Sequence, residues 1–105
     1  MCGILGGINI DKQLFEPAKK RLQHRGPDEN GEFEYQQLYL YHARLSIQDI
    51  STGQQPLHNN GYTIIFNGEI YNHVELRKTY NLQCKTNSDT ETLLLLYQKL
   101  GIKFL

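Results

Sequence analysis

Cys2 is the residue whose chemistry the rest of the chain would have to serve. It directly follows Met1, and an initiator methionine before a small residue is normally removed, which would leave Cys2 with a thiol and a free α-amine. The amine has a reference pKa of about 7.7–8.0, whereas a thiol at about 8.5 stays mostly protonated, so the amine can take the thiol's proton. Nucleophile and general base would then share one residue. The alternative is a small apolar residue in a buried first strand.

Two further motifs carry polar groups suited to a substrate site. Asn67-Gly68-Glu69 follows an apolar run. The amide and the unobstructed glycine N–H could form an oxyanion hole, worth about 10²–10³ in rate per donor. An ordinary turn at the end of a strand is the alternative. Arg44 stands in a segment suited to burial, where its planar guanidinium would need a carboxylate. Spacing alone favours a partly exposed arginine paired with Asp49 or another acid.

Asp89 and the bend HRGPD at residues 24–28 are weaker candidates. Asp89 falls in the first turn of an expected helix, where the helix dipole stabilises a carboxylate. It either caps that helix or faces a cleft and receives an ammonium group. The bend is either a surface turn or an ordered loop beside a site. The four histidines have no HxxH or HExxH spacing, so the sequence predicts no metal site.

The elements that would position these residues are short and alternate along the chain. Residues 2–10 predict a buried first strand whose glycines keep side chains small. Residues 15–23 predict a short helix, and residues 31–45 predict two strands. A polar connection over residues 48–58 leads to the hairpin signal Asn60-Gly61 and a strand over residues 62–66. Cap boxes predict helices over residues 73–80 and from residue 88 to about residue 101.

Bulk composition narrows the class of protein. With 105 residues the chain amounts to one domain, and its 11 basic residues equal its 11 acidic residues. The chain therefore has no net positive charge that would attract it to nucleic acid or to an anionic membrane. No apolar run reaches the roughly 18 residues of a membrane span, and no signal peptide is recognisable. We expect a cytoplasmic protein whose two cysteines are reduced.

Taken jointly, the motifs resemble a known family. Cys2 behind Met1, HRGPD at residues 24–28, RLSI at 44–47, QPL at 55–57, NGEIYN at 67–72 and Ser88-Asp89 are similar, in order and spacing, to the glutaminase domain of glutamine-hydrolysing asparagine synthetases. This domain is a class II glutamine amidotransferase of the N-terminal-nucleophile group. The resemblance implies an α+β fold, a sandwich of antiparallel sheets with flanking helices (αββα), of which residues 1–105 would supply about the first half.

The resemblance also implies roles for individual residues. Cys2 would attack the side-chain carbonyl of glutamine, forming a γ-glutamyl thioester and releasing ammonia, while Asn67 and Gly68 stabilise the oxyanion. Arg44 would hold the α-carboxylate, and Asp89 and Glu69 would receive the α-ammonium. The pocket would be lined by the backbone of Leu45, Ser46, Ile47 and Gln48. Such a pocket could reject analogues lacking either charged group by up to about 10⁴–10⁵.

The resemblance covers the glutaminase domain alone, and this limits the activity expected of the chain. The family's synthetase domain, which uses ATP and Mg, is absent, so the chain alone would need no cofactor and could not make asparagine. In the complete protein, the ammonia would pass to an activated aspartate, and a homodimer is compatible with the resemblance. Two alternatives stay open: the same half-reaction could feed another acceptor, or the chain could be a non-catalytic glutamine-binding remnant.

Overall fold

The computed structural model describes residues 2–45 and 53–104. In chain order the longer elements are β1 (Gly3–Ile8), α1 (Phe15–Leu22), β2 (Glu29–Tyr35), β3 (Leu38–Arg44), β4 (Leu57–Asn59), β5 (Tyr62–Ile64), α2 (His73–Thr79) and α3 (Asp89–Leu100). Short 3-10 turns η1 (Lys12–Leu14), η2 (Gln23–Arg25) and η3 (Gly101–Phe104) accompany the helices. No helix in these two ranges is long and apolar enough to cross a membrane.

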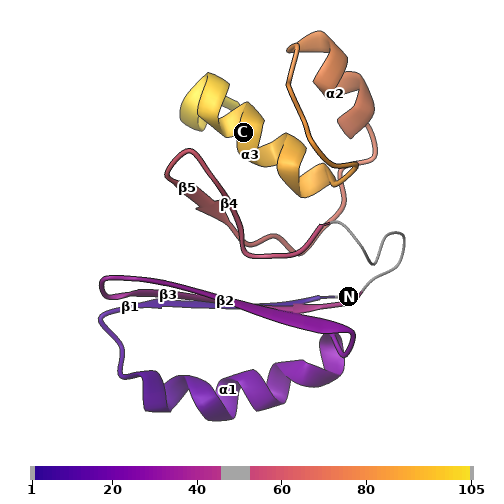
Figure 1. Ribbon diagram of the computed structural model, residues 1–105. Coiled ribbons are helices and arrows are strands. Elements are labelled where there is room, and N and C mark those ends of the chain that lie inside the picture. Colours follow the sequence, from indigo (N-terminus) through magenta and orange to yellow (C-terminus); the bar gives the residue numbers. More distant parts are fainter. Residues whose placement is uncertain (1, 46–52, 105) are drawn as a thin grey trace.

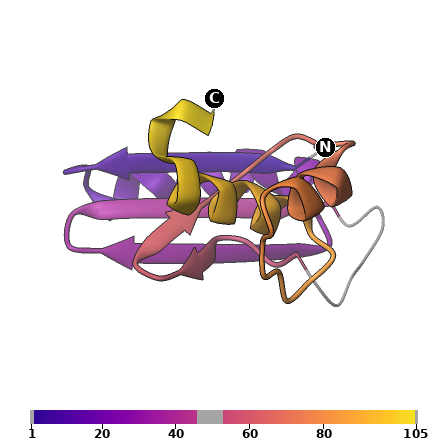
Figure 2. The ribbon, with the colours of Figure 1, turned by 90° about the horizontal axis from the view of Figure 1, so that it is seen from above.

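The elements form layers. Helix α1 covers one face of a three-stranded sheet, and the hairpin β4–β5 with α2 and α3 covers the other (Figure 1). Seen from above, the hairpin lies over the β2 and β3 side of that sheet (Figure 2), where Phe33 of β2 stacks on His58 of β4 at 5.6 Å between ring centroids. All pairings among the described strands are antiparallel. The predicted α+β class is therefore confirmed.

Strand β3 is the centre of the three-stranded sheet, whose order is β1-β3-β2. Gly3 pairs with Ala43 on one side, and Glu29 pairs with Arg44 on the other. With a strand on each side and a layer on each face, β3 is buried from Tyr41 through Arg44, and Ala43 has no exposed surface. The strand that carries Arg44 is thus enclosed by a strand on each side and by a layer on each face.

The core beneath this sheet explains the glycines of β1. Phe15 of α1 packs against Tyr39 with ring centroids 4.6 Å apart. A Cβ on Gly7 would lie 2.5 Å from the Phe15 ring, so this glycine makes room for a core aromatic residue. The expectation of a fully buried first strand was wrong. Ile4 and Ile8, which point to the face away from α1, are 44% and 67% exposed.

The hairpin β4–β5 turns where the sequence predicts. Asn60 and Gly61 have φ values of 50° and 80°, the positive pair that a two-residue type I′ turn requires. Strand β5 ends at Ile64, two residues earlier than expected. The reason is that the Phe66 N–H donates to the side chain of Gln55 at 2.6 Å. A side-chain acceptor here replaces the main-chain acceptor that a continuing strand would use.

The two C-terminal helices begin differently. Ser88 caps α3, because its hydroxyl accepts from the Thr90 N–H at 3.2 Å, and the helix ends at Gly101 with φ 63°. Leu94 and Leu96 are buried, and Leu93 and Leu95 are half-buried. The predicted cap at Asn72 was wrong: its ψ of 23° is not the extended conformation of a cap, and its side chain makes no cap hydrogen bond.

Candidate functional site

Cys2 lies immediately before β1 and against the end of β3. The Leu45 N–H donates to its Sγ at 3.4 Å, and the thiol points back to the Leu45 carbonyl at 3.9 Å. The antiparallel register causes this contact, because pairing Gly3 with Ala43 brings the preceding residue beside the end of β3. The thiol is half-buried and forms no disulfide. The structure therefore holds the sulfur at a fixed place on the central strand.

Arg44 is buried, with 8% of its surface exposed, and it forms an ion pair with Glu29 at 2.9 Å. The expectation of a partly exposed arginine was wrong, because the guanidinium points to a covered face of β3, where the chain at Gly53 lies against it. The partner is another acid, its neighbour across the β2–β3 ladder. Asp49, the other partner considered, lies outside the described residues.

The Arg44 guanidinium also reaches the start of α3. A Cβ built on Gly53 would lie 3.3 Å from Nη2 of Arg44 and 3.6 Å from Oγ of Ser88. Gly53 has φ 85°, a conformation that favours glycine, so the chain passes closely between the two side chains. Arg44 and Ser88, which precedes Asp89, are thereby brought together from positions far apart in the sequence.

Asn67, Gly68 and Glu69 follow β5 and are all exposed. The residue before them is held firmly: Phe66 donates its N–H to Gln55, and its carbonyl lies 3.2 Å from Nε2 of His42. A Cβ on Gly68 would come within 2.7 Å of the Phe66 ring, so the folded-back ring requires a glycine here. The three exposed residues thus follow a residue whose main chain is held in place.

Asp89 is half-buried, and its carboxylate accepts from the Ile70 N–H at 2.9 Å. Ser88 caps the helix and Asp89 lies in its first turn, as the cap box predicts. In addition, the Asp89 carboxylate fastens the chain directly after Glu69 to the start of α3. The structure thereby brings Asp89 together with the segment of residues 67–70.

His42 of β3 is fully buried, and its ring contacts the Phe66 carbonyl. Burial is the main cause that lowers its pKa, and the neighbouring Arg44 acts in the same direction, against the Phe66 carbonyl and Glu29. A neutral ring at ordinary pH must carry its proton on Nε2 to donate to the Phe66 carbonyl. His42 thereby links β3 to the segment before Asn67.

The HRGPD bend also packs on the end of β3. A Cβ on Gly26 would lie 2.1 Å from the main-chain carbon of Ala43, and the Asp28 N–H donates to the Arg44 carbonyl at 3.1 Å. The bend is therefore an ordered support for the strand that carries Arg44. The predicted lining residues Ser46, Ile47 and Gln48 lie outside the described residues.

Two charged side chains hold the loop that leads into α3. Arg77 of α2 donates to Thr92, to the Thr86 carbonyl and to the Ser88 carbonyl at 2.7, 2.5 and 2.6 Å. Glu91 accepts from the Lys85 and Thr86 N–H groups, both at 2.8 Å. Together they fix the turn from which Asp89 projects.

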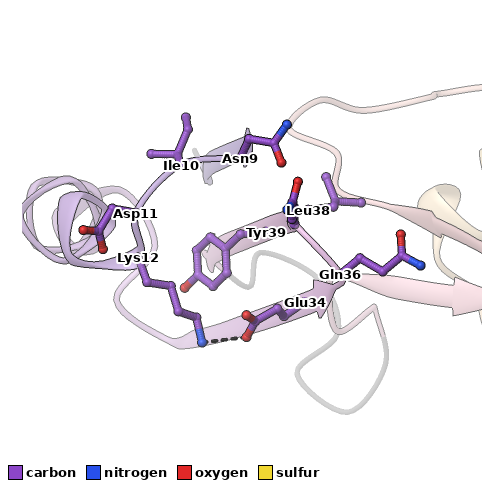
Figure 3. Close-up of a pocket in the computed structure, with 9 residues that line it drawn as sticks. Asn9, Ile10, Asp11, Lys12, Glu34, Gln36, Leu38 and Tyr39 are labelled. Carbon is purple, nitrogen blue, oxygen red and sulfur yellow. Dashed lines mark ion pairs between the residues drawn. The ribbon is translucent and has the colours of Figure 1, made fainter.

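A cavity of about 530 Å³ lies at the opposite end of the sheet from Cys2. It opens between the β1–α1 connection and the β2–β3 turn (Figure 3), where Lys12 pairs with Glu34 at 2.6 Å. The lining residues are Asn9, Ile10, Asp11, Lys12, Glu34, Gln36, Gln37, Leu38 and Tyr39. This set includes none of the site residues predicted from the sequence.

Sequence reasoning missed three residues that organise the site: Glu29, His42 and Gln55. The QPL motif did contain Gln55, and the HRGPD motif ends one residue before Glu29. His42 was considered only as a metal ligand. Each acts through a contact with a distant part of the chain, which spacing along the sequence does not reveal.

Comparison with known proteins gives the family. The glutamine amidotransferase domain matches residues 1–105. The chain is 44% identical to asparagine synthetase B [glutamine-hydrolyzing] of Escherichia coli, over 100% of this chain and 21% of that protein. It is 43% identical to asparagine synthetase [glutamine-hydrolyzing] 1 of Arabidopsis thaliana, over 99% of this chain and 19% of that protein. The chain is 38% identical to the putative asparagine synthetase [glutamine-hydrolyzing] 2 of Methanocaldococcus jannaschii, over 96% of this chain and 24% of that protein.

These relatives are much longer proteins, and the chain spans about a fifth of their length. The family match nevertheless extends from the first residue to the last, through Cys2, Arg44 and Asp89. The chain therefore belongs to the glutamine amidotransferase domain family.

Proposed function

We propose that this chain carries the nucleophile and the substrate-recognition residues of a site that hydrolyses glutamine. The observation that carries the proposal is the position of Cys2, whose thiol is held beside the strand end that bears Arg44, in a chain that matches the family throughout. Removal of Met1 would give Cys2 its free α-amine. That amine takes the thiol proton, as its reference pKa of about 7.7–8.0 allows.

The thiolate then adds to the side-chain carbonyl carbon (Cδ) of glutamine. The carbonyl π electrons move to oxygen, and the amide N–H of Gly68 and the side-chain amide of Asn67 stabilise that oxyanion. The C–N bond breaks, and the leaving nitrogen takes the proton from the α-ammonium of Cys2 and departs as ammonia. Water, deprotonated by the same amine, hydrolyses the γ-glutamyl thioester to glutamate and returns the thiol.

The pocket would select glutamine through charged residues at its two ends, a cation at one and carboxylates at the other. Arg44 binds the α-carboxylate, with Glu29 fixing the plane of the guanidinium through its ion pair. Asp89 and Glu69 receive the α-ammonium. The approach of Arg44 to Ser88 supports this arrangement, because it puts the cation next to the helix turn that bears Asp89.

We further propose that the described layers are part of an N-terminal-nucleophile sandwich. The exposed Ile4 and Ile8 on the face of β1 away from α1 support this, since further strands would cover them. In the complete protein, a synthetase domain with ATP and Mg would use the ammonia to make asparagine from aspartate. The names of the relatives support this acceptor over that of another amidotransferase.

The test is the intact mass of the purified protein before and after incubation with 6-diazo-5-oxo-norleucine, a glutamine analogue that alkylates such thiols. We expect loss of one methionine mass and a single adduct that maps to Cys2. Cys84 is the matched control, since it is also half-buried and burial raises the pKa of its thiol. Cys84→Ser should keep the adduct and Cys2→Ala should abolish it, whereas a processed wild type without an adduct would contradict the proposal.

A further inference from the structure

Phe66, the residue before the two proposed oxyanion donors, has both of its main-chain polar groups held by side chains. Oε1 of Gln55 accepts from its N–H at 2.6 Å, and Nε2 of His42 lies 3.2 Å from its carbonyl oxygen. The ladder between β4 and β5 has already ended at Ile64. Side chains rather than sheet pairing therefore set the direction in which Asn67 leaves the fold.

The Gln55 side chain has a second partner. Its Nε2 donates to Oγ1 of Thr90 at 3.1 Å, and Thr90 is buried in the first turn of α3 beside Asp89. One primary amide thus contacts the segment that leads to Asn67 on its oxygen side and the helix that bears Asp89 on its nitrogen side. A glutamine supplies an acceptor and a donor at this spacing, whereas a carboxylate supplies acceptors only.

The main chain of Gln55 is itself fixed to the sheet. A Cβ on Gly31 of β2 would lie 2.1 Å from the Gln55 carbonyl oxygen, so only a glycine allows this close approach. Gln55 therefore connects three parts of the fold: the central sheet, the exit from β5 and the N-terminal turn of α3. A side chain with these contacts is placed to set distances within the site.

We propose that Gln55 is a positioning residue of the glutaminase reaction, which holds the donors at Asn67 and Gly68 at a fixed distance from Asp89. The proposal rests on the proposed function. The oxyanion forms at the side-chain carbonyl carbon (Cδ) of glutamine, whereas Asp89 would bind the α-ammonium at the other end of the same substrate. The spacing of the two contacts must therefore match the length of glutamine, and a misplacement of about 1 Å can cost about 10²-fold in rate.

The experiment uses the complete gene product that contains residues 1–105, and first establishes that the wild type hydrolyses glutamine. Gln55→Leu keeps the volume but removes both hydrogen bonds. We expect kcat to fall about 10- to 100-fold. Alkylation of Cys2 by iodoacetamide, which needs the thiol but no oxyanion donor, should stay within about twofold of wild type. Gln55→Glu keeps an acceptor for the Phe66 N–H but removes the donor to Thr90, so it should recover most of kcat while kcat/KM stays about 10-fold low, as in Thr90→Val.

Gln98→Leu is the matched control. Gln98 also joins α3 to the hairpin, donating to the Asn59 carbonyl at 3.0 Å, but it does so on the last turns of the helix, far along it from Asp89. We expect this variant to lose stability without losing kcat. If Gln55→Leu does not fold, Thr90→Val removes the helix side of the bridge, together with the long contact of 3.5 Å from the Thr90 hydroxyl to Asp89, and should lower kcat/KM about 10-fold.

Three results would overturn the proposal. An unchanged kcat in Gln55→Leu, or an unchanged kcat/KM in Thr90→Val where Gln55→Leu does not fold, would make Gln55 a purely structural residue. A parallel loss of hydrolysis and of iodoacetamide alkylation would mean that the thiol or its surroundings were lost, not the position of the oxyanion donors. A processed wild type that never hydrolyses glutamine would refute the proposed function itself, and this outcome is recognised before any variant is compared.

Discussion

Glu91 offers a sharp test of how the entry to α3 is stabilised. It is 6% exposed, and its two oxygens receive three hydrogen bonds from the preceding loop. Oε1 accepts from the Lys85 N–H at 2.8 Å, and Oε2 accepts from the N–H and the hydroxyl of Thr86 at 2.8 and 2.7 Å. The variant Glu91→Gln keeps the shape of the side chain and changes one oxygen into a donor.

The expected cost follows from those bonds. In its better orientation the new amide keeps its oxygen towards Thr86, but its NH2 then faces the Lys85 N–H, which loses its acceptor. An unsatisfied donor costs about 1–3 kcal/mol, and the remaining bonds lose the extra strength that a charged acceptor gives. We expect the free energy of unfolding to fall by about 2–3 kcal/mol. At roughly 4–8 °C per kcal/mol for a domain of this size, Tm should fall by at least about 8 °C.

The pH dependence distinguishes this cause from a general loss of packing. Burial raises the pKa of Glu91, but the hydrogen bonds from Lys85 and Thr86 and the charge of Arg77 outweigh it, so the folded pKa is below 4.5. The stability that the carboxylate contributes is therefore present above pH 4.5 and is lost as the pH falls through the lower folded pKa. A protonated Glu91 resembles the glutamine of the variant, so the difference between the two proteins should shrink in acid.

The assay is urea unfolding of the wild type and Glu91→Gln, followed by circular dichroism at neutral pH and at about pH 3. Glu75→Gln, which changes an exposed glutamate in α2, is the control for net charge and should shift stability by less than about 0.5 kcal/mol. A stability difference between wild type and Glu91→Gln that is the same at both pH values would refute the reasoning. So would an equal loss in Glu75→Gln.

Three further predictions concern β3 and its neighbours. Arg44→Lys, which loses the planar fork, should raise KM for glutamine about 10- to 100-fold with a smaller change in kcat, and an unchanged KM in steady-state kinetics would contradict the assignment. Burial lowers the pKa of His42, so its contribution to stability should be complete above pH 6.5 and fall as the pH drops from there towards the folded pKa; unfolding curves between pH 7 and 5 should show a slope that His42→Gln lacks. Gly26→Ala should cost about 3 kcal/mol by thermal unfolding, because its methyl group would meet the main chain of Ala43.

The sequence predicted most of the elements because their signals are local. The Asn60-Gly61 turn, the Ser88 cap and the Gly101 end need only the residues next to them, and all three are present. The expected burial of β1 failed because alternation along a strand does not say what covers its second face. The predicted end of β5 at residue 66 was wrong because the N–H of Phe66 bonds a side chain eleven positions away.

The candidate site was predicted as a set of residues, not as a geometry. Cys2, Arg44 and Asp89 were named from motifs, but the ion pair of Arg44 with Glu29 depends on strand register. The hydrogen bond from Ile70 to Asp89 depends on how two loops meet. Such contacts arise from tertiary packing, so no pattern within one element could have indicated them.

The close contact of Gly7 in β1 affects the position of Cys2, the proposed nucleophile. Glycine within a strand weakens it, yet a Cβ at Gly7 would collide with the ring of Phe15. A slip of one residue in the pairing with β3 would turn the opposite face of β1 towards α1 and could bring Ile8 to that place. It would also move Cys2 along the strand by about 3.3 Å. The small residues of the first strand thus disfavour misaligned pairings with β3, and in this way they fix the position of the Cys2 sulfur from a distance.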